Sequence, residues 1–232
     1  NMPSTIDNKK NSSANPCAYC CFNTVCTAEG GHKPDHSFIV RTRHFASNEA
    51  LCVMNSKFQS IYVIKKGAVK AYQVDINGYE HIHAFYFSGE SLGFRAIHTG
   101  HYVSTVVALT DTIVCDVPYH QFIVKLKTNP ELYKSFFSLV SKQLTASAYV
   151  DTATAEQRIA AFIIDLSLRA DSVTPPLELT LPMSRNDIGN YLRLTAETVS
   201  RVLSRLHKQN IIHTNRKFIR IENLAKLKQL AQ

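Results

Sequence analysis

The stretch RNDIGNYLRLTAETVSRVLSRL, residues 185–206, decides the fold of this chain. Ser184 stands directly before it and Asp187 follows three residues later, which is the capping-box form that starts a helix. The step Arg193-Leu194-Thr195 then makes a tight turn, and Thr195 can cap a second helix that runs to about Lys208. On this second helix the apolar residues face inward at helical spacing: Val199, Val202, Leu203 and Leu206. Two short helices around a tight turn indicate a helix-turn-helix, whose second helix enters the major groove of DNA.

The residues after the second helix extend this pattern into a winged helix. IIHTNRKFIRI, residues 211–221, reads as two short strands around the polar turn Asn215-Arg216-Lys217. Between Pro182 and Arg220 the chain has eight Lys and Arg residues against two acids, which is most of the net charge of +8. The alternative is that these charges merely solvate an ordinary helical face. Caps, turn, polar face and wing all agree, so the segment predicts a partner of double-stranded DNA.

The outward side chains of the second helix suit base recognition. Arg201 can bond guanine in a bidentate manner, Glu197 can accept from cytosine, and Ser200 can serve either partner. The remaining polar residues are better suited to phosphates, which position a protein without specifying sequence. These expected phosphate contacts are Arg185, Thr195, Thr198, Arg205, Arg216 and Lys217.

The first half of the chain has a different character. From residue 38 to residue 118, short runs rich in Val, Ile, Tyr and Phe alternate with turn signals, among them Lys66-Gly67 and Asn77-Gly78. Such runs predict hairpins in an antiparallel barrel or roll. No apolar run reaches the ~18 residues of a membrane span, and the polar N-terminus does not read as a secretory signal. We therefore expect a cytoplasmic protein without a membrane partner, and no nucleotide fingerprint or nucleophile–base pair indicates an enzyme.

Residues 130–154 predict one long helix between the two halves. Its apolar stripe consists of Leu132, Phe136, Leu139, Val140, Leu144 and Ala148. The stripe can pack on the β-roll or pair with a second chain, and we favour the second because a helix between domains has little core to cover. Asp151, near the end of the stripe, is then expected to face its symmetry mate, where like charges oppose pairing. We expect a homodimer with only a marginally stable interface.

The resulting prediction is an α+β chain in four parts. Residues 1–30 form a flexible segment with clustered cysteines, and residues 31–129 form a β-roll sensor domain. Residues 130–154 form the dimerisation helix. Residues 155–232 form a winged helix-turn-helix DNA-binding domain.

A β-roll, a long helix and a winged helix, in this order, resemble the CRP/FNR family of bacterial transcription regulators. The resemblance implies that the β-roll is a cyclic-nucleotide-binding-like jelly roll. Glu197 followed by Ser200-Arg201 resembles the FNR branch, because the CRP branch typically has Gly before the Arg. The resemblance implies a homodimer that binds the palindrome TTGAT-N4-ATCAA, contacts RNA polymerase as an activator or repressor, and controls anaerobic gene expression in response to oxygen.

Four of the six cysteines lie within CAYCCFNTVC, residues 17–26. In a reducing compartment such a cluster is more often a metal or redox site than a set of disulfides. The resemblance implies that Cys17, Cys20 and Cys26, with Cys115 from the roll, hold an oxygen-labile [4Fe–4S] cluster. Zinc, or a thiol switch, is the alternative for the same residues. Cys52, in the β-rich stretch ALCVM, is expected to be a buried apolar filler.

The same resemblance argues against cyclic nucleotide binding. Gly89-Glu90 is present, but Val103 precedes Ser104 where the family has the Arg that pairs with the cyclic phosphate. A buried phosphate without that counter-charge is costly.

The chain differs from the family in one further respect, because the first turns lack the usual glycines. Asn48 and Asn55 stand there instead, and asparagine tolerates positive φ.

Overall fold

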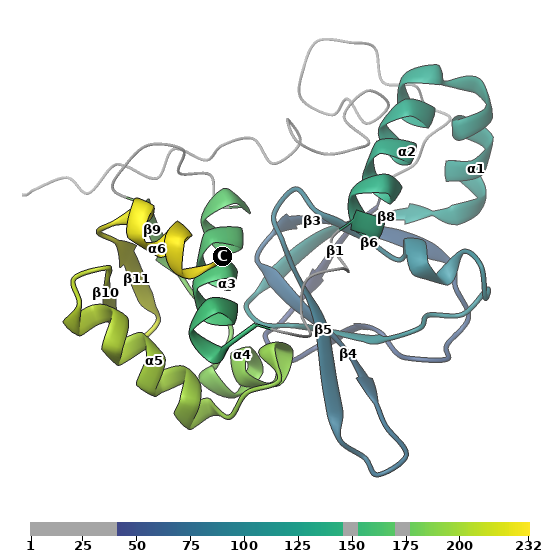
Figure 1. Cartoon of the computed structure of the whole chain (residues 1–232). Coiled ribbons are helices and arrows are strands. Elements are labelled where there is room, and N and C mark those ends of the chain that lie inside the picture. The colour runs from purple at the N-terminus through teal and green to yellow at the C-terminus, as the bar shows by residue number, and fades with distance from the viewer. Residues whose placement is uncertain (1–40, 146–152, 170–176) are drawn as a thin grey trace, which may run out of the picture.

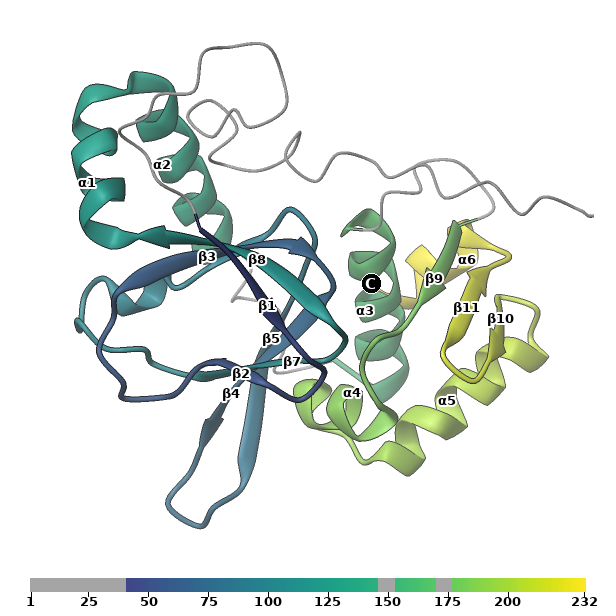
Figure 2. The same ribbon diagram turned by 180° about the vertical axis from the view of Figure 1, so that it is seen from behind.

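The structure, a computed structural model, describes residues 41–145, 153–169 and 177–232. Two parts lie side by side in both views, a β-roll with two helices and a winged helix (Figure 1, Figure 2). Within the described ranges, no helix is long and apolar enough to cross a membrane.

The β-roll consists of two four-stranded antiparallel sheets, as the sequence predicts. One sheet has the strand order β1-β8-β3-β6 and the other β2-β7-β4-β5. The strands are β1 (Arg41–Phe45), β2 (Ala50–Cys52), β3 (Ser60–Lys66), β4 (Ala68–Val74), β5 (Glu80–Phe87), β6 (Ser91–Leu92), β7 (Thr105–Ala108) and β8 (Thr112–Pro118). A short 3-10 turn, Phe94–Ala96, follows β6.

Only one of the two predicted hairpins is confirmed. Gly78, with φ of 84°, lies in the turn between the paired strands β4 and β5. Gly67, with φ of 95°, also lies in a turn, but it joins β3 to β4, which belong to different sheets, so the predicted hairpin at Lys66-Gly67 is wrong. A Cβ at Gly67 would lie 2.6 Å from the Thr112 hydroxyl oxygen, so no larger residue fits there. Asn48 and Asn55 have φ of 70° and 67°, which confirms that asparagine supplies the left-handed backbone in these turns.

Helices α1 (Tyr119–Thr128) and α2 (Pro130–Thr145) pack on the roll, and this corrects part of the predicted dimer stripe. Leu132 has no exposed surface and belongs to the core of the roll. The Phe136 ring centroid lies 5.4 Å from the ring centroids of Phe94 and Phe122. Leu139 also packs against this core. The first part of the stripe, Leu132, Phe136 and Leu139, therefore covers the chain's own β-roll, and Leu132 cannot contact a second copy in this conformation.

The face of α2 next to this buried stripe carries two exposed aromatic residues. Tyr133 and Phe137 are 52% and 50% exposed, and their ring centroids lie 4.6 Å apart. Val140, from the predicted stripe, is half-buried. The side chain of Leu144 and the residues Ala148 and Asp151 lie outside what the structure describes.

The structure describes helix α2 as far as Thr145, and the part of the predicted helix from 146 to 152 lies outside the described residues. Residues 153 and 154, the last two of the predicted range, are not helical. Thr154 instead caps α3 (Ala155–Arg169), because its hydroxyl accepts from the Gln157 amide at 3.2 Å while the Gln157 side chain accepts from the Thr154 amide at 2.7 Å. This reciprocal cap starts α3 at Ala155, which is the boundary that the sequence predicts between residues 130–154 and 155–232.

The winged helix is built as predicted, with one additional strand. After α3 come β9 (Leu177–Thr180), α4 (Arg185–Leu192), α5 (Ala196–Lys208), β10 (Ile212–Asn215), β11 (Phe218–Ile221) and α6 (Leu224–Leu230). Strands β10 and β11 form the expected wing, and β9, which was not predicted, pairs with β11. The inward residues of α5 form the core with α3, and all four are buried: Val199, Val202, Leu203 and Leu206.

Candidate nucleic-acid interface and sensor elements

The entry to the helix-turn-helix is fixed by local hydrogen bonds. The Ser184 hydroxyl accepts from the Asp187 amide at 3.0 Å, and the Asp187 carboxylate accepts from the Ser184 amide at 3.0 Å, which confirms the capping box. Arg193 takes a left-handed backbone with φ of 56° at the end of α4. A Cβ at Gly189 would lie 2.7 Å from the Leu194 carbonyl oxygen, so the two helices approach at a point where only glycine fits. This close approach fixes the angle between α4 and α5.

The recognition helix α5 exposes the residues predicted to contact bases. Its start is capped by Thr195, whose hydroxyl accepts from the Thr198 amide at 3.1 Å. Glu197, Ser200 and Arg201 are all exposed, on the side opposite the buried residues. These three groups share one continuous polar face near the helix N-terminus, the part of a recognition helix that enters the major groove.

The residues predicted to contact phosphates fall into two groups. Arg216 and Lys217 are exposed in the wing turn. Arg185 is half-buried, and its guanidinium donates to the Arg216 carbonyl at 2.7 Å, so it holds the wing against the start of α4. Burial lowers the pKa of Arg185. Sequence reasoning missed this structural role because the contact spans 31 residues.

The remaining members of the set lie at the ends of the same surface. The exposed Arg205 lies 3.5 Å from Glu156 of α3, which links α5 to the helix before it. Thr198 is half-buried, and its hydroxyl lies 2.9 Å from that of Thr195. Both hydroxyls serve the start of α5, and because one of them donates to the other, only one hydroxyl hydrogen of the pair is left to donate to a phosphate.

The two described cysteines differ in what they can bind. Cys52 is 8% exposed, and burial raises the pKa of its thiol to about 12. A metal ligand must be a thiolate, so Cys52 is the buried filler that the sequence predicts. Cys115 is partly exposed on β8, opposite Thr42 and Val63 of the neighbouring strands. Within the described residues no group of three or more metal-ligating side chains is present. Cys17, Cys20 and Cys26 lie outside those residues.

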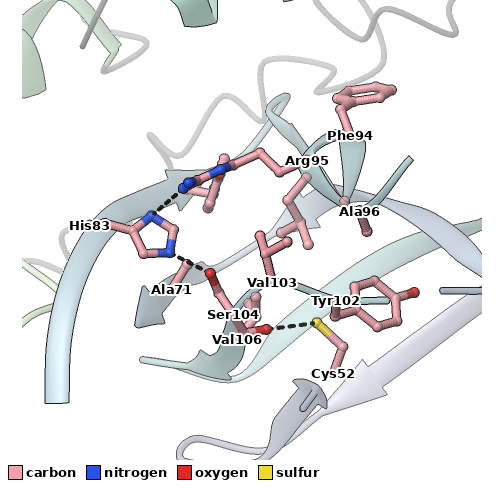
Figure 3. A pocket seen from close by; sticks show the side chains of 13 residues that line it. Cys52, Ala71, His83, Phe94, Arg95, Ala96, Tyr102, Val103, Ser104 and Val106 are labelled. Carbon is pink, nitrogen blue, oxygen red and sulfur yellow. Dashed lines mark hydrogen bonds between the residues drawn. The ribbon is translucent and has the colours of Figure 1, made fainter. Parts of the chain in front are cut away.

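A small cavity lies inside the roll, where Val103 and Ser104 come together with His83 and Arg95 (Figure 3). His83 donates through Nε2 to the Ser104 hydroxyl at 2.6 Å, while its Nδ1 accepts from Arg95 at 3.2 Å. Burial, and the Arg95 charge, lower the pKa of His83 to about 4, so the imidazole is neutral at pH 7. The partners of this histidine lie 12 and 21 residues away, so the local sequence pattern does not indicate them.

The lining of this cavity offers a cyclic phosphate few groups, which agrees with the expectation that no cyclic nucleotide binds here. Its volume is about 30 Å³, room for about two water molecules. His83 occupies the Ser104 hydroxyl, and Val103 supplies no charge for a phosphate. Arg95 is the basic residue that lines it, and its guanidinium already donates to His83.

Comparison with known proteins gives a consistent result over nearly the whole chain. Residues 157–230 match the family model of the Crp-like helix-turn-helix domain, and residues 42–129 match that of the cyclic nucleotide-binding domain. The fumarate and nitrate reduction regulatory protein of Escherichia coli K12 is 34% identical over 224 residues, covering 93% of this chain and 90% of that protein. The corresponding Klebsiella oxytoca protein has the same identity and coverage.

Solved structures agree with this result. FixK2 from Bradyrhizobium japonicum superposes with a TM-score of 0.76 at 26% identity, over 84% of this chain and 98% of that one. A putative cyclic nucleotide binding protein from Ruegeria pomeroyi gives 0.62 at 26% identity, over 83% and 85% of the two chains. The predicted succession of roll, helices and winged helix is thus found in these proteins.

Proposed function

The chain belongs to the CRP/FNR family of transcription regulators, and we propose that it is a global regulator that responds to oxygen through a [4Fe–4S] cluster and binds palindromic DNA as a homodimer. The proposed site is the FNR-type palindrome TTGAT-N4-ATCAA. In this proposal the protein acts in the cytoplasm, controls anaerobic gene expression and contacts RNA polymerase.

The observation that carries the proposal is the exposed face of α5. Glu197, Ser200 and Arg201 lie there free of the domain core, in the order typical of the FNR branch. Relatives named for fumarate and nitrate reduction are 34% identical over 93% of this chain, which supports the same branch. Two copies of α5 in a dimer, about one DNA turn apart, fit a palindromic target.

Cys17, Cys20, Cys26 and Cys115 would hold the cluster. A cubane cluster takes four thiolates, and of the two described cysteines only Cys115 is accessible enough to supply one. When bound, the cluster supplies reactivity toward oxygen. Because three of these cysteines come from the N-terminal segment and Cys115 comes from β8, binding of the cluster would join that segment to the roll. Cluster binding and the arrangement of the chain would then be coupled.

The experiment compares metal content in three proteins purified without air: wild type, Cys115→Ser and the matched control Cys52→Ser. We expect about four iron and four sulfide per chain, with visible absorbance that bleaches in air, in wild type and Cys52→Ser. Cys115→Ser should lose both iron and absorbance. Colourless wild type with about one zinc per chain would instead support the zinc alternative. A Cys115→Ser protein with full iron content would make Cys21 the candidate fourth ligand.

The proposed dimer forms through α2 and the residues that follow it. The exposed rings of Tyr133 and Phe137 support this face as the place where a second copy packs. We expect a dimer with the cluster and mainly monomer without it at micromolar concentration, and Asp151→Ala should favour the dimer in air. Sedimentation with and without oxygen tests both. A tight dimer without the cluster would contradict this part of the proposal.

A further inference from the structure

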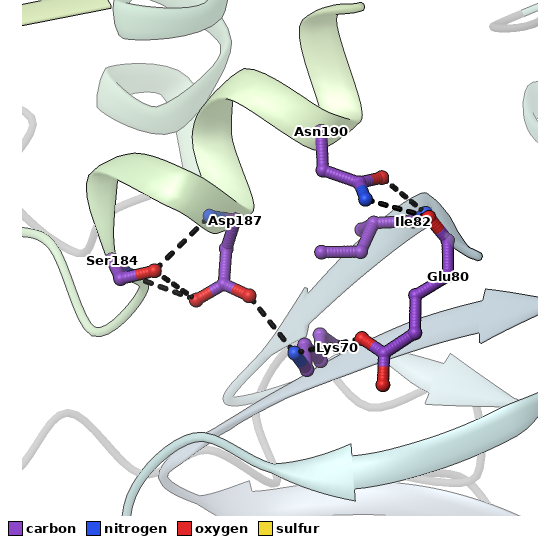
Figure 4. A network of polar contacts seen from close by, with 6 residues as sticks. All are labelled: Lys70, Glu80, Ile82, Ser184, Asp187 and Asn190. Atoms are coloured by element: carbon purple, nitrogen blue, oxygen red, sulfur yellow. Dashed lines mark hydrogen bonds and ion pairs between the residues drawn. The ribbon is translucent and has the colours of Figure 1, made fainter. Parts of the chain in front are cut away.

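The winged helix is attached to the β-roll by a side-chain amide that pairs with a strand edge. Strand β5 ends its sheet, so its outer backbone groups have no neighbouring strand. Asn190 of α4 supplies a partner for two of them (Figure 4). Its Oδ1 accepts from the Ile82 amide at 2.7 Å, and its Nδ2 donates to the Glu80 carbonyl at 2.7 Å. Both contacts are short and satisfy groups that would otherwise require water.

An ion pair lies beside this amide contact. Lys70 of β4 lies 2.9 Å from the carboxylate of Asp187 and 3.5 Å from that of Glu80. The side chains of Lys70 and Asp187 are only 18% and 16% exposed, so solvent screens the pair less than a surface pair. Burial alone would lower the pKa of Lys70, but its bonds to Asp187 and Glu80 raise it, so the pair is charged at neutral pH.

Asp187 belongs to the helix-turn-helix as well as to this ion pair. One carboxylate oxygen closes the capping box with Ser184, and the other meets Lys70 (Figure 4). The residue that starts the first helix of the DNA-reading unit is therefore bonded directly to the sensor domain.

A second polar contact lies at the end of α3. The Arg169 guanidinium donates to the two Glu90 oxygens at 2.8 and 2.7 Å and to the Phe85 carbonyl at 2.6 Å. Between the two polar contacts the Phe85 ring packs against Phe162 and Tyr191, with centroids 6.2 and 5.2 Å apart. Glu90, part of the Gly89-Glu90 step that the sequence retains, is thus used for contact between the domains.

This interface does not cover the exposed face of α5 that carries Glu197, Ser200 and Arg201, which we call the reading face. The surfaces that contact the roll are α4 and the end of α3. The interface therefore fixes the direction in which α5 points without covering it. The direction of α5 matters most when the two recognition helices of a dimer must bind two DNA half-sites at once. Two linked binding units gain affinity only if their geometry allows both to bind at the same time.

We propose that Lys70 and Asn190 are positioning residues with which the β-roll holds the winged helix in the orientation required for two-half-site DNA. The inference rests on the homodimer of the proposed function. Loss of either contact frees the winged helix to rotate, so the palindrome loses affinity while a single half-site does not. Neither residue touches DNA in this role.

The test measures binding of anaerobic, full-length protein to two duplexes, the palindrome and a version with one half-site scrambled. The variants are Lys70→Met, Asn190→Ala, the conservative Lys70→Arg, and the control Lys66→Met, which removes an exposed charge from β3, the strand that precedes β4 in the chain. We expect Lys70→Met and Asn190→Ala to weaken palindrome binding about tenfold and half-site binding less than twofold. Lys70→Arg and Lys66→Met should resemble wild type, and thermal unfolding checks that each variant folds.

Three results would overturn the inference. Equal weakening on both duplexes would mean a direct contact with DNA phosphates. Unchanged palindrome binding would mean that the interface is irrelevant to binding, and tighter binding would mean that it restrains an inactive state. If wild type itself does not prefer the palindrome over the half-site, the proposed homodimeric reading fails as well, which separates that failure from the failure of the positioning role.

Discussion

The winged helix and the β-roll differ in how far along the chain their functional residues are spread. The three residues proposed to read bases, Glu197, Ser200 and Arg201, lie within five positions of one helix. In the roll, Cys115 comes from β8, His83 from β5 and Ser104 from the residues before β7, while the other proposed thiols lie between residues 17 and 26. A reading face can thus be built by one element, whereas a sensor requires the whole tertiary structure.

The difference extends to the chemistry of the two regions. The side chains proposed to contact bases are exposed. The polar groups at the cavity of the roll are instead bonded to one another, since half-buried His83 contacts both the buried Ser104 and the exposed Arg95. Substitutions in the packed core of the roll should therefore act on stability, and those on the exposed face of α5 should act on binding alone.

The largest expected effect is on the roll. Leu132→Ala should lower the free energy of unfolding by about 2–5 kcal/mol, because it leaves a cavity in the core of the domain. Phe137→Ala, on the exposed face of the same helix, is the matched control and should change stability by less than about 1 kcal/mol. Urea unfolding of the cluster-free protein measures both. Equal effects would mean that the two faces of α2 are not distinct.

The next effect is on the winged helix. Arg201→Ala should cost about 1–3 kcal/mol at the palindrome and relax its sequence preference, with unfolding unchanged. Lys217→Ala should weaken binding to all sequences and reduce the salt slope by about one. Titrations with cognate and random duplexes at several salt concentrations separate the roles. Identical behaviour of the two variants would show that base and phosphate roles are wrongly assigned.

The contrast also explains what the sequence predicts and what it misses. Helix caps at Ser184 and Thr195, and turns at Gly67 and Asn48, depend on residues a few positions apart, and all are confirmed. The inward direction of Leu132 was missed, because an amphipathic stripe shows which face is apolar but not which surface covers it. The bonds of Lys70 to Asp187 span 117 residues, and neither residue type signals such a pairing.

A smaller effect concerns the pH dependence of the free energy of unfolding. Because burial lowers the pKa of His83 to about 4, below the ~6.5 of an unfolded histidine, the unfolded chain binds the proton between these values. The contribution of His83 to stability is therefore fully present above pH 6.5 and is lost as the pH falls toward 4. His83→Gln, which does not titrate, should flatten the pH dependence of unfolding over this range. A variant with the same slope as wild type would assign the acid sensitivity to other groups.

The central claim is that the cysteines of the N-terminal segment and of the roll control DNA binding by the exposed face of α5. The most direct test follows one anaerobic sample of wild type while air is admitted. Iron content and affinity for the palindrome are measured at each time point. We expect affinity to fall in step with iron, while the affinity of air-treated protein for random DNA changes little. Palindrome binding that stays constant as the iron is lost would contradict the account.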